Sequence, residues 1–353
     1  MGCPSLQNFA ESLGASSVGE YRGAVTAARF SDSQAEFEAL HAGCGVYDLG
    51  YRAKLTLTGE DRVRWLNGMV TNNIRDLAVG QGVYAFLLNP QGRILGDLYA
   101  YNRGESIVVD TDRSQVEKIL ATFDHYIIMD DVEVKDQSEE MTAIGISGPK
   151  ALAVLRAAGI GIPEAGPLQI FDVTCDCDCD CTKCTAVRRE CIGPESYELW
   201  LKPPDIKTTW DALVAHGAIP VGSEALELLR IQSGIPQYGV DIRERDLPQE
   251  TEQARALNFN KGCYVGQEIV ERIRSRGAVH RKFTGFVSQT GEALSPGSKI
   301  VLGEKEVGEI TSAGSVRGHA LGLGYIRREA AVPGKEVLIG SVRARVSDVP
   351  FKI

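Results

Sequence analysis

Cys263 stands apart from the other cysteines of the chain, in a stretch that could activate a thiol. The run Lys261–Glu268 reads KGCYVGQE. Val265, Ile269 and Ile273 recur at four-residue spacing, which predicts a helix with these residues on one face. Cys263 is then expected just before or at the helix N-terminus, where free N–H groups and the macrodipole favour a thiolate. The sequence leaves two interpretations open, a reactive or ligating thiol and a small buried apolar residue.

Three charged side chains stand in patterns that suit a ligand. Asp97 follows a tight turn at Asn89–Gly92 and could hold a developing cation, or it could lie on the polar side of a strand. Glu195 follows a Gly-Pro turn, where it could accept two parallel hydrogen bonds from a pterin or guanine edge, or stabilise the turn. Arg230 interrupts an apolar helical run and needs an anion or a ring, either in a structural salt bridge or in a ligand.

A run of alternating cysteines and aspartates is the most unusual segment of the chain. In an extended strand its cysteines would share one face, and the thiols could bind zinc, copper(I) or an iron–sulfur cluster. The spacing is not that of a structural zinc site, so a solvated loop is the alternative. The five histidines show no ligand spacing. The possible metal ligands are Cys175, Cys177, Cys179, Cys181 and Cys184.

The composition is that of an ordinary globular protein of two or three domains. The 353 residues carry a net charge of −9, which argues against direct nucleic-acid binding. We find no secretory signal and no apolar run long enough to span a membrane. These features predict a cytoplasmic protein, or a mitochondrial matrix protein in a eukaryote, in which the nine cysteines stay reduced.

Periodicity predicts an α+β fold. Residues 52–135 read as a β-α-β-β-α-β unit of the ferredoxin-like kind, and residues 141–233 show a second pass of strands and helices. From Lys282 onward short strands alternate with turns, which predicts a small β-barrel. We place a domain boundary near Gly277.

The motif KGCYVGQE resembles the K-G-C-Y-x-G-Q-E signature of the YgfZ-type folate-binding proteins, which are relatives of the glycine cleavage T-protein, an aminomethyltransferase. The resemblance covers nearly the whole chain. Gly80–Asp97 is similar to the stretch that lines the folate pocket of the family, and Gly193–Leu199 and Leu229–Asp241 are similar to further T-protein segments.

The resemblance implies a cloverleaf of three domains around a central hole that holds tetrahydrofolate or a one-carbon derivative. The expected folate-binding domain comprises residues 1–52 and 141–276, the ferredoxin-like domain 53–140, and the barrel 277–353. By the same likeness Tyr84, Asp97, Glu195 and Arg230 would line the folate site. Cys263 would lie near its mouth and, with Asp97, would carry the chemistry. The motif residues are Lys261, Gly262, Cys263, Tyr264, Gly266, Gln267 and Glu268.

The family likeness also implies a function: a folate-binding accessory protein for iron–sulfur cluster assembly or repair, which serves enzymes of tRNA modification among others. Its partners would be iron–sulfur proteins and their assembly factors, a cluster could bind transiently, and the protein would be a monomer. The alternative is a folate-dependent aminomethyltransferase or demethylase. Two departures count against the alternative: the chain has Gly96-Asp97-Leu98 where the T-protein has paired aspartates, so only one carboxylate remains, and Cys263 and Gln267 replace an aspartate and an arginine. A metal-binding scaffold is a third hypothesis.

Overall fold

The computed structural model describes residues 10–174, 184–190, 195–277 and 279–353. The chain divides into two compact units, which are considered one at a time. The first comprises Met1–Asn67, Asn73–Tyr84 and Leu98–Leu226, and the second comprises Gly68–Asn72, Ala85–Asp97 and Glu227–Ile353. The predicted boundaries of three domains stay a prediction.

A five-stranded sheet has the predicted ferredoxin-like strand order and contains one strand in addition to the four of that pattern. Its sheet order is β5-β6-β7-β4-β8, in which β5 is the additional edge strand. The rings of Trp65 and Phe123 meet edge-on at 5.0 Å and join the two helices of this β-α-β-β-α-β pattern. The elements are β4 (Arg52–Thr58), α3 (Arg62–Met69), β5 (Gly82–Leu88), β6 (Ile94–Asn102), β7 (Ile107–Asp112), α4 (Val116–Tyr126) and β8 (Glu133–Asp136).

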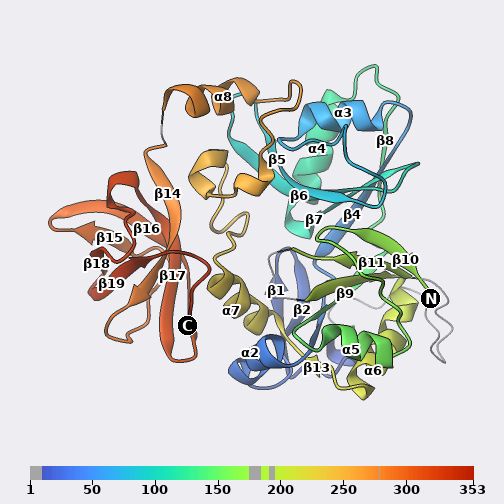
Figure 1. Ribbon diagram of the computed structural model, residues 1–353, viewed down its shortest axis with the longest axis horizontal. Coiled ribbons are helices and arrows are strands. Elements are labelled where there is room, and N and C mark those ends of the chain that lie inside the picture. Colours follow the sequence, from blue (N-terminus) through green and yellow to red (C-terminus); the bar gives the residue numbers. More distant parts are fainter. Residues whose placement is uncertain (1–9, 175–183, 191–194, 278) are drawn as a thin grey trace. The chain divides into compact units, whose positions relative to one another are not determined.

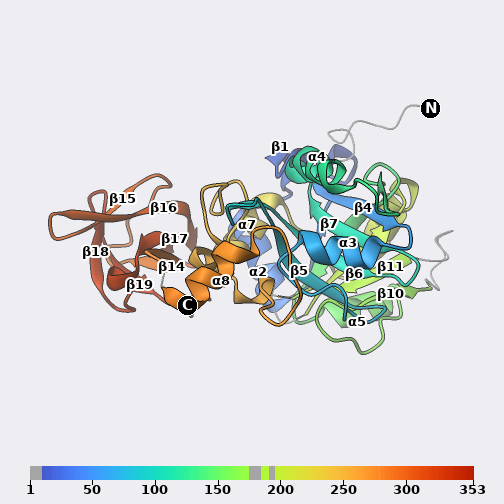
Figure 2. The same cartoon turned by 90° about the horizontal axis from the view of Figure 1, so that it is seen from above.

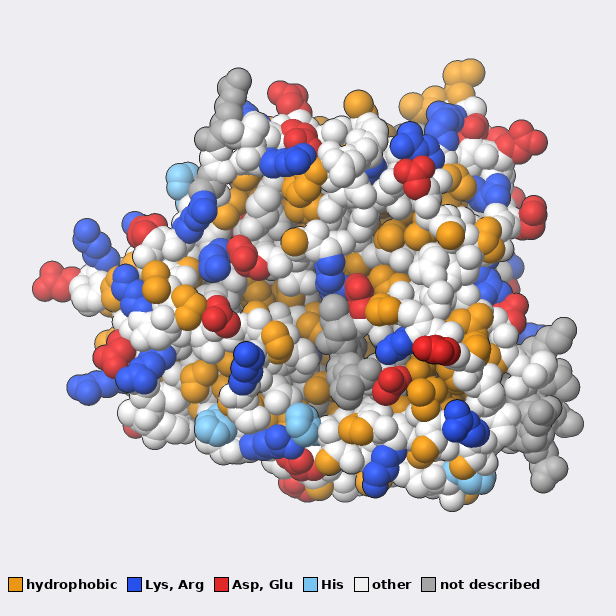
Figure 3. Space-filling view, viewed as in Figure 1, with side chains coloured by type: hydrophobic (Ala, Val, Ile, Leu, Met, Phe, Trp, Pro, Cys, Tyr) orange, Lys and Arg blue, Asp and Glu red, His pale blue; other side chains and the backbone are white. Residues whose placement is uncertain are grey.

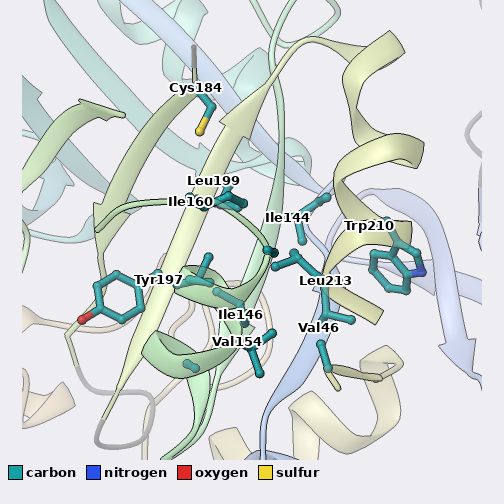
Figure 4. Packing of buried hydrophobic residues seen from close by; sticks show 14 of the residues in the cluster. Val46, Ile144, Ile146, Val154, Ile160, Cys184, Tyr197, Leu199, Trp210 and Leu213 are labelled. Carbon is teal, nitrogen blue, oxygen red and sulfur yellow. The ribbon is translucent and has the colours of Figure 1, made fainter. Parts of the chain in front are cut away.

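A six-stranded sheet in the order β10-β11-β12-β9-β3-β13 lies within the first unit. Figure 4 shows its apolar core, to which Tyr197 and Leu199 of one strand and Trp210 and Leu213 of a helix contribute. The elements are β3 (Gly45–Asp48), β9 (Thr142–Ser147), α5 (Ala151–Ala157), β10 (Ile170–Val173), β11 (Cys184–Arg188), β12 (Ser196–Leu201), α6 (Ile206–Ala215) and β13 (Ile219–Pro220).

The N-terminal part of the described chain adds a hairpin and one helix. The hairpin pairs β1 (Ser17–Tyr21) with β2 (Ala24–Arg29). Helix α2 spans Ser33–Ala42. It begins there because the carboxylate of Asp32 accepts hydrogen bonds from the N–H groups of Gln34 and Ala35, which have no partner inside the helix.

The C-terminal strands close into a six-stranded barrel, which confirms the prediction (Figures 1 and 2). Its order is β14-β17-β16-β15-β18-β19, and inward-facing side chains such as Phe286, Ile310 and Val346 fill the interior. The strands are β14 (Arg281–Ser288), β15 (Lys299–Leu302), β16 (Lys305–Val316), β17 (His319–Arg327), β18 (Glu336–Ile339) and β19 (Val342–Ser347).

Two helices and several single turns complete the described chain. None of the helices in the described ranges is long and apolar enough to cross a membrane. The helices are α7 (Ser223–Ser233) and α8 (Gln267–Arg276), and the 3₁₀ turns are η1 (Arg113–Gln115), η2 (Pro203–Asp205), η3 (Pro248–Thr251), η4 (Ala254–Ala256) and η5 (Arg328–Ala330).

Candidate functional site

The thiol of Cys263 is exposed, so the interpretation of this residue as a buried apolar filler is wrong. The predicted helix exists as α8, but it begins at Gln267, and Gly266 is its N-cap residue. Cys263 therefore lies in a loop before the cap rather than in the first helical turn. Gly266 has φ of +81°, and a Cβ on it would lie 2.5 Å from the carbonyl oxygen of Asn89. Only glycine fits this position.

Lys261 holds the cysteine loop in place. Its side chain is 7% exposed, and its Nζ donates hydrogen bonds to the carbonyl oxygens of Val70 and Asn72 at 2.6 and 2.7 Å. The backbone N–H of Val265 donates to Gly68, and that of Asn258 donates to Thr71. All of these residues belong to the second unit. Residues 68–72 thus hold the loop, and the two carbonyl oxygens give the buried ammonium of Lys261 hydrogen-bond partners.

The remaining motif residues shape the loop or face solvent. Tyr264 is buried, and burial, with a smaller effect from Glu271, raises its pKa to about 12. The side-chain oxygen of Gln267 accepts a hydrogen bond from the N–H of Tyr264 at 3.3 Å, which closes the turn. Gly262 and Glu268 are exposed. The motif therefore presents one exposed thiol on a backbone that its neighbours constrain.

Asp97 lies half-buried on β6, which returns from the predicted hairpin turn. The tip of that turn is Gly92, with φ of +72°, and a Cβ on it would lie 2.7 Å from the Cβ of Ile269 in α8. The turn and α8 are therefore in close contact within the second unit. Two strand residues before Asp97, the carbonyl oxygen of Leu95 accepts the hydroxyl of Tyr238 at 2.5 Å. These contacts fix the strand that carries the carboxylate.

Tyr84 and Glu195 belong to the first unit. Tyr84 is 4% exposed, and its ring centroid lies 5.0 Å from that of Tyr99. The carboxylate of Glu195 is 29% exposed. One of its oxygens accepts the hydroxyl of Tyr197 at 2.7 Å, and Arg188 approaches the other at 3.7 Å. Burial and this hydrogen bond raise the pKa of Tyr197, so the phenol stays a donor to Glu195.

Arg230 is a structural residue in this fold, which favours one of the two roles that its position in the sequence left open. The guanidinium is buried, and protein acceptors take all five of its N–H groups. It donates to the carbonyl of Ile235 and to Asp241 at 2.6 Å each, to the hydroxyl of Ser312 at 2.7 Å, and twice to Glu227. The group joins α7 to the barrel within the second unit.

A buried ionic cluster in the first unit escaped the sequence analysis. Lys54 is fully buried, and its Nζ lies 2.7 Å from Asp110. Arg52 lies 2.6 Å from the same carboxylate, and Arg189 lies 3.3 Å from it. Glu198 is 3% exposed and lies 3.2 Å from Arg189. Burial alone would raise the pKa of Asp110, but the three cations outweigh burial and hold this pKa well below its usual range. Burial lowers the pKa of Lys54.

Comparisons with known proteins identify the family. The family model described as GCVT N-terminal domain matches residues 7–261, and the Glycine cleavage T-protein C-terminal barrel domain matches residues 281–352. The chain belongs to the glycine cleavage T-protein family. The relatives include an aminomethyltransferase of Herpetosiphon aurantiacus, 30% identical over 292 residues, which are 80% of this chain and 77% of that protein.

Two further members of the T-protein family resemble the chain. An aminomethyltransferase of Rubrobacter xylanophilus is 29% identical over 276 residues, which are 78% of this chain and 73% of that protein. The solved structure of aminomethyltransferase T of the glycine cleavage system from Bartonella henselae superposes with a TM-score of 0.87 at 21% identity. It covers 98% of this chain and 96% of the other. The superposition confirms the predicted fold.

The site that the T-protein likeness implies remains a prediction. Tyr84 and Glu195 lie in the first unit, whereas Asp97, Arg230 and Cys263 lie in the second. Among the residues that the structure describes, no three histidine, cysteine or acidic side chains are placed to hold a metal. Cys184 is buried in the apolar core. The other four predicted metal ligands, Cys175, Cys177, Cys179 and Cys181, lie outside the described residues.

Proposed function

We propose that this protein binds tetrahydrofolate and transfers a one-carbon unit in the manner of an aminomethyltransferase. The observation that carries the proposal is the family match, which extends over both the N-terminal region and the barrel. Relatives that carry the name aminomethyltransferase cover more than three quarters of the chain. The comparisons thus favour the alternative of the sequence analysis over its first interpretation.

The side chains of the first unit fit a reduced pterin. Glu195 is partly exposed, and the oxygen near Arg188 has only that one distant cation beside it in the described part of the chain. Each carboxylate oxygen has two lone pairs, so Glu195 can still accept from an amino-imino edge while it holds Tyr197. Tyr84 is almost fully buried against Tyr99 and would form part of the wall beneath the pterin ring. These two residues would bind and orient the ring.

Asp97 is the residue that we assign to charge stabilisation. Tetrahydrofolate supplies the nitrogens that accept the one-carbon unit. A half-buried carboxylate on a fixed strand stabilises positive charge better than one in water, because it needs no reorganisation during the reaction. One carboxylate suffices for this role, so Gly96 in place of a second aspartate does not exclude it.

The test combines binding and turnover with the full chain. Tetrahydrofolate is titrated by calorimetry, and ammonia release is measured with an aminomethyl-lipoyl protein as donor. We expect saturable binding that Glu195→Gln weakens at least tenfold, and turnover that Asp97→Asn abolishes while binding persists. Glu329→Gln, which changes an exposed acid of the barrel, is the control. Absence of saturable binding would refute the proposal, and binding without turnover would refute its catalytic part.

The exposed thiol of Cys263 favours a second candidate, the YgfZ-type accessory role in iron–sulfur cluster assembly or repair. An aminomethyl transfer as outlined above has no use for this thiol, yet Lys261 and residues 68–72 hold its loop rigidly. A deletion strain scored for iron–sulfur enzyme activity separates the candidates. If the accessory role is correct, Cys263→Ala fails to restore those enzymes although its folate binding is unchanged. If Cys263→Ala restores them fully, the accessory role of the thiol is excluded.

A further inference from the structure

A cleft of about 350 Å³ opens on the C-terminal barrel, entirely within the second unit. Strands β14 to β17 form its walls, and the loop at Arg245 adds to its rim. Thr311 lines it at a break in the register between β16 and β17. Such bulges re-aim side chains and are over-represented beside binding sites. None of the residues assigned to folate or to the thiol contributes to this cleft.

Basic side chains dominate the lining, and the structure neutralises only part of their charge. Arg281 lies 2.5 Å from Asp246 and 3.1 Å from Glu250. Lys299 forms ion pairs with both acidic residues of the lining, Glu306 at 3.1 Å and Glu309 at 3.4 Å. Arg245 only approaches Asp246, at 4.0 Å, and is 60% exposed. Among the residues that the structure describes, no carboxylate forms an ion pair with Arg327, so the positive charges of Arg245 and Arg327 are largely uncompensated there, beside His280.

The register of the barrel places two arginines of this lining opposite each other. Arg281 of β14 pairs with Arg327 of β17 in the antiparallel ladder. Like charges directly opposite in a sheet destabilise it. Asp246 and Glu250 offset the charge of Arg281, whereas Arg327 is exposed. An anion in the cleft would offset the charge of Arg327.

Tyr325 contributes a polar group that the protein leaves unused. Its side chain is 4% exposed, it lines the cleft, and the guanidinium of Arg281 lies 4.6 Å from its ring. Within the described part of the chain its hydroxyl has no hydrogen-bond partner. Burial and the neighbouring Asp246 and Asp241 raise its pKa, so the hydroxyl stays protonated and can donate. A buried donor without an acceptor is costly, and a ligand oxygen would satisfy it.

The charge pattern around the cleft favours a compact anion over a nucleic-acid strand. Glu306 and Glu309 lie within the lining, and acidic and basic side chains are interspersed on the barrel side of the face in Figure 3. A nucleic-acid strand needs a continuous basic track, which this pattern interrupts. Two arginines and a hydroxyl donor instead match a compact dianion, since guanidinium groups bind phosphate oxygens in pairs.

We propose that this cleft binds a small phosphorylated molecule. Arg327 and Arg245 contact the phosphate oxygens, and the hydroxyl of Tyr325 donates to one of them. The site is separate from the proposed folate chemistry and does not depend on it.

The test is calorimetric titration of the full chain with inorganic pyrophosphate at constant ionic strength. We expect one saturable site. Arg327→Gln should weaken binding at least tenfold, whereas Arg345→Gln, which removes an exposed arginine of β19 elsewhere on the barrel, should leave it unchanged. Tyr325→Phe should weaken binding several-fold without lowering the melting temperature, because the hydroxyl has no hydrogen-bond partner to lose among the described residues.

Three results would overturn the proposal. The first is the absence of saturable binding at millimolar pyrophosphate. The second is an equal loss of affinity in Arg345→Gln, which would mean that general surface charge is responsible. The third is equal or tighter binding of malonate or of a single-stranded oligonucleotide, which would assign the cleft to another ligand class.

Discussion

The ammonium nitrogen of Lys261 lies 2.6 Å from the carbonyl oxygen of Val70, although 191 residues separate the two in the chain. This contact, with its companion to Asn72, joins the cysteine loop to the end of α3. Lys261 therefore has a structural role: it fixes the position of the loop that carries the thiol of Cys263.

Replacement of Lys261 by methionine should destabilise the protein. The carbonyls of Val70 and Asn72 would lose their donor while they stay covered, which costs about 1–3 kcal/mol. Urea unfolding measures the change. Lys305→Met, at an exposed lysine of the barrel, is the control and should change the stability little. If both variants unfold alike, Lys261 does not hold the loop.

The cysteines should differ in reactivity according to burial. Cys263 is exposed, whereas Cys44 and Cys184 are buried in the apolar core. Burial raises the pKa of Cys44 to about 12, so its thiol is protonated and unreactive at neutral pH. Iodoacetamide labelling of the native protein, followed by peptide mass spectrometry, should modify Cys263 before Cys44 and Cys184. Cys44 and Cys184 should react only after unfolding; fast labelling of either in the native state would contradict the fold.

Removal of Arg230 should affect stability more than ligand binding. Arg230→Met leaves Asp241 buried without its cation, which costs about 3–5 kcal/mol. Arg243→Gln is the matched control, because its pair with Glu309 is partly exposed and contributes at most about 1 kcal/mol. The double variant Arg230→Met/Asp241→Leu should recover part of the loss. If Arg230→Met is stable but fails to bind tetrahydrofolate, the residue belongs to the ligand site instead.

The buried cluster around Asp110 should make stability depend on acid pH. The folded pKa of Asp110 is lowered from 3.8, so its contribution is present above pH 3.8 and is lost as pH falls toward the lowered value. Asp110→Asn leaves three cations without this carboxylate and should cost about 3–5 kcal/mol at pH 7. The gap between wild type and variant should narrow below about pH 4. Urea unfolding at several pH values measures it, with the exposed Asp211→Asn as control.

Local patterns predicted most elements because neighbouring residues decide them. Short strands that alternate with turns from Lys282 onward predict the barrel. Asp32 and the spacing of Phe37 and Leu40 account for α2. The tight turn at Asn89–Gly92 predicts the hairpin, because glycine tolerates the positive φ that the turn requires.

Periodicity did not predict the burial of charged side chains whose partners lie on segments distant in the sequence. In a strand with one solvated face, Lys54 would point to water; instead it is fully buried beside Asp110 of β7. Arg230 shows the same limit. The sequence predicts its helix, but the packing of α7 against β16 decides whether its guanidinium binds a ligand or Asp241. The sequence contains the charges but not their distances.

The sequence by itself therefore determined the α+β class, the C-terminal barrel, the relation to the glycine cleavage T-protein and the presence of the motif around Cys263, because these depend on residue type and short-range order. Only the tertiary structure decided that Cys263 is exposed, that Lys261 is buried beneath its loop, and that Arg230 is saturated by protein acceptors. Burial and hydrogen-bond partners arise from contacts between segments far apart in the chain, and no local pattern records them.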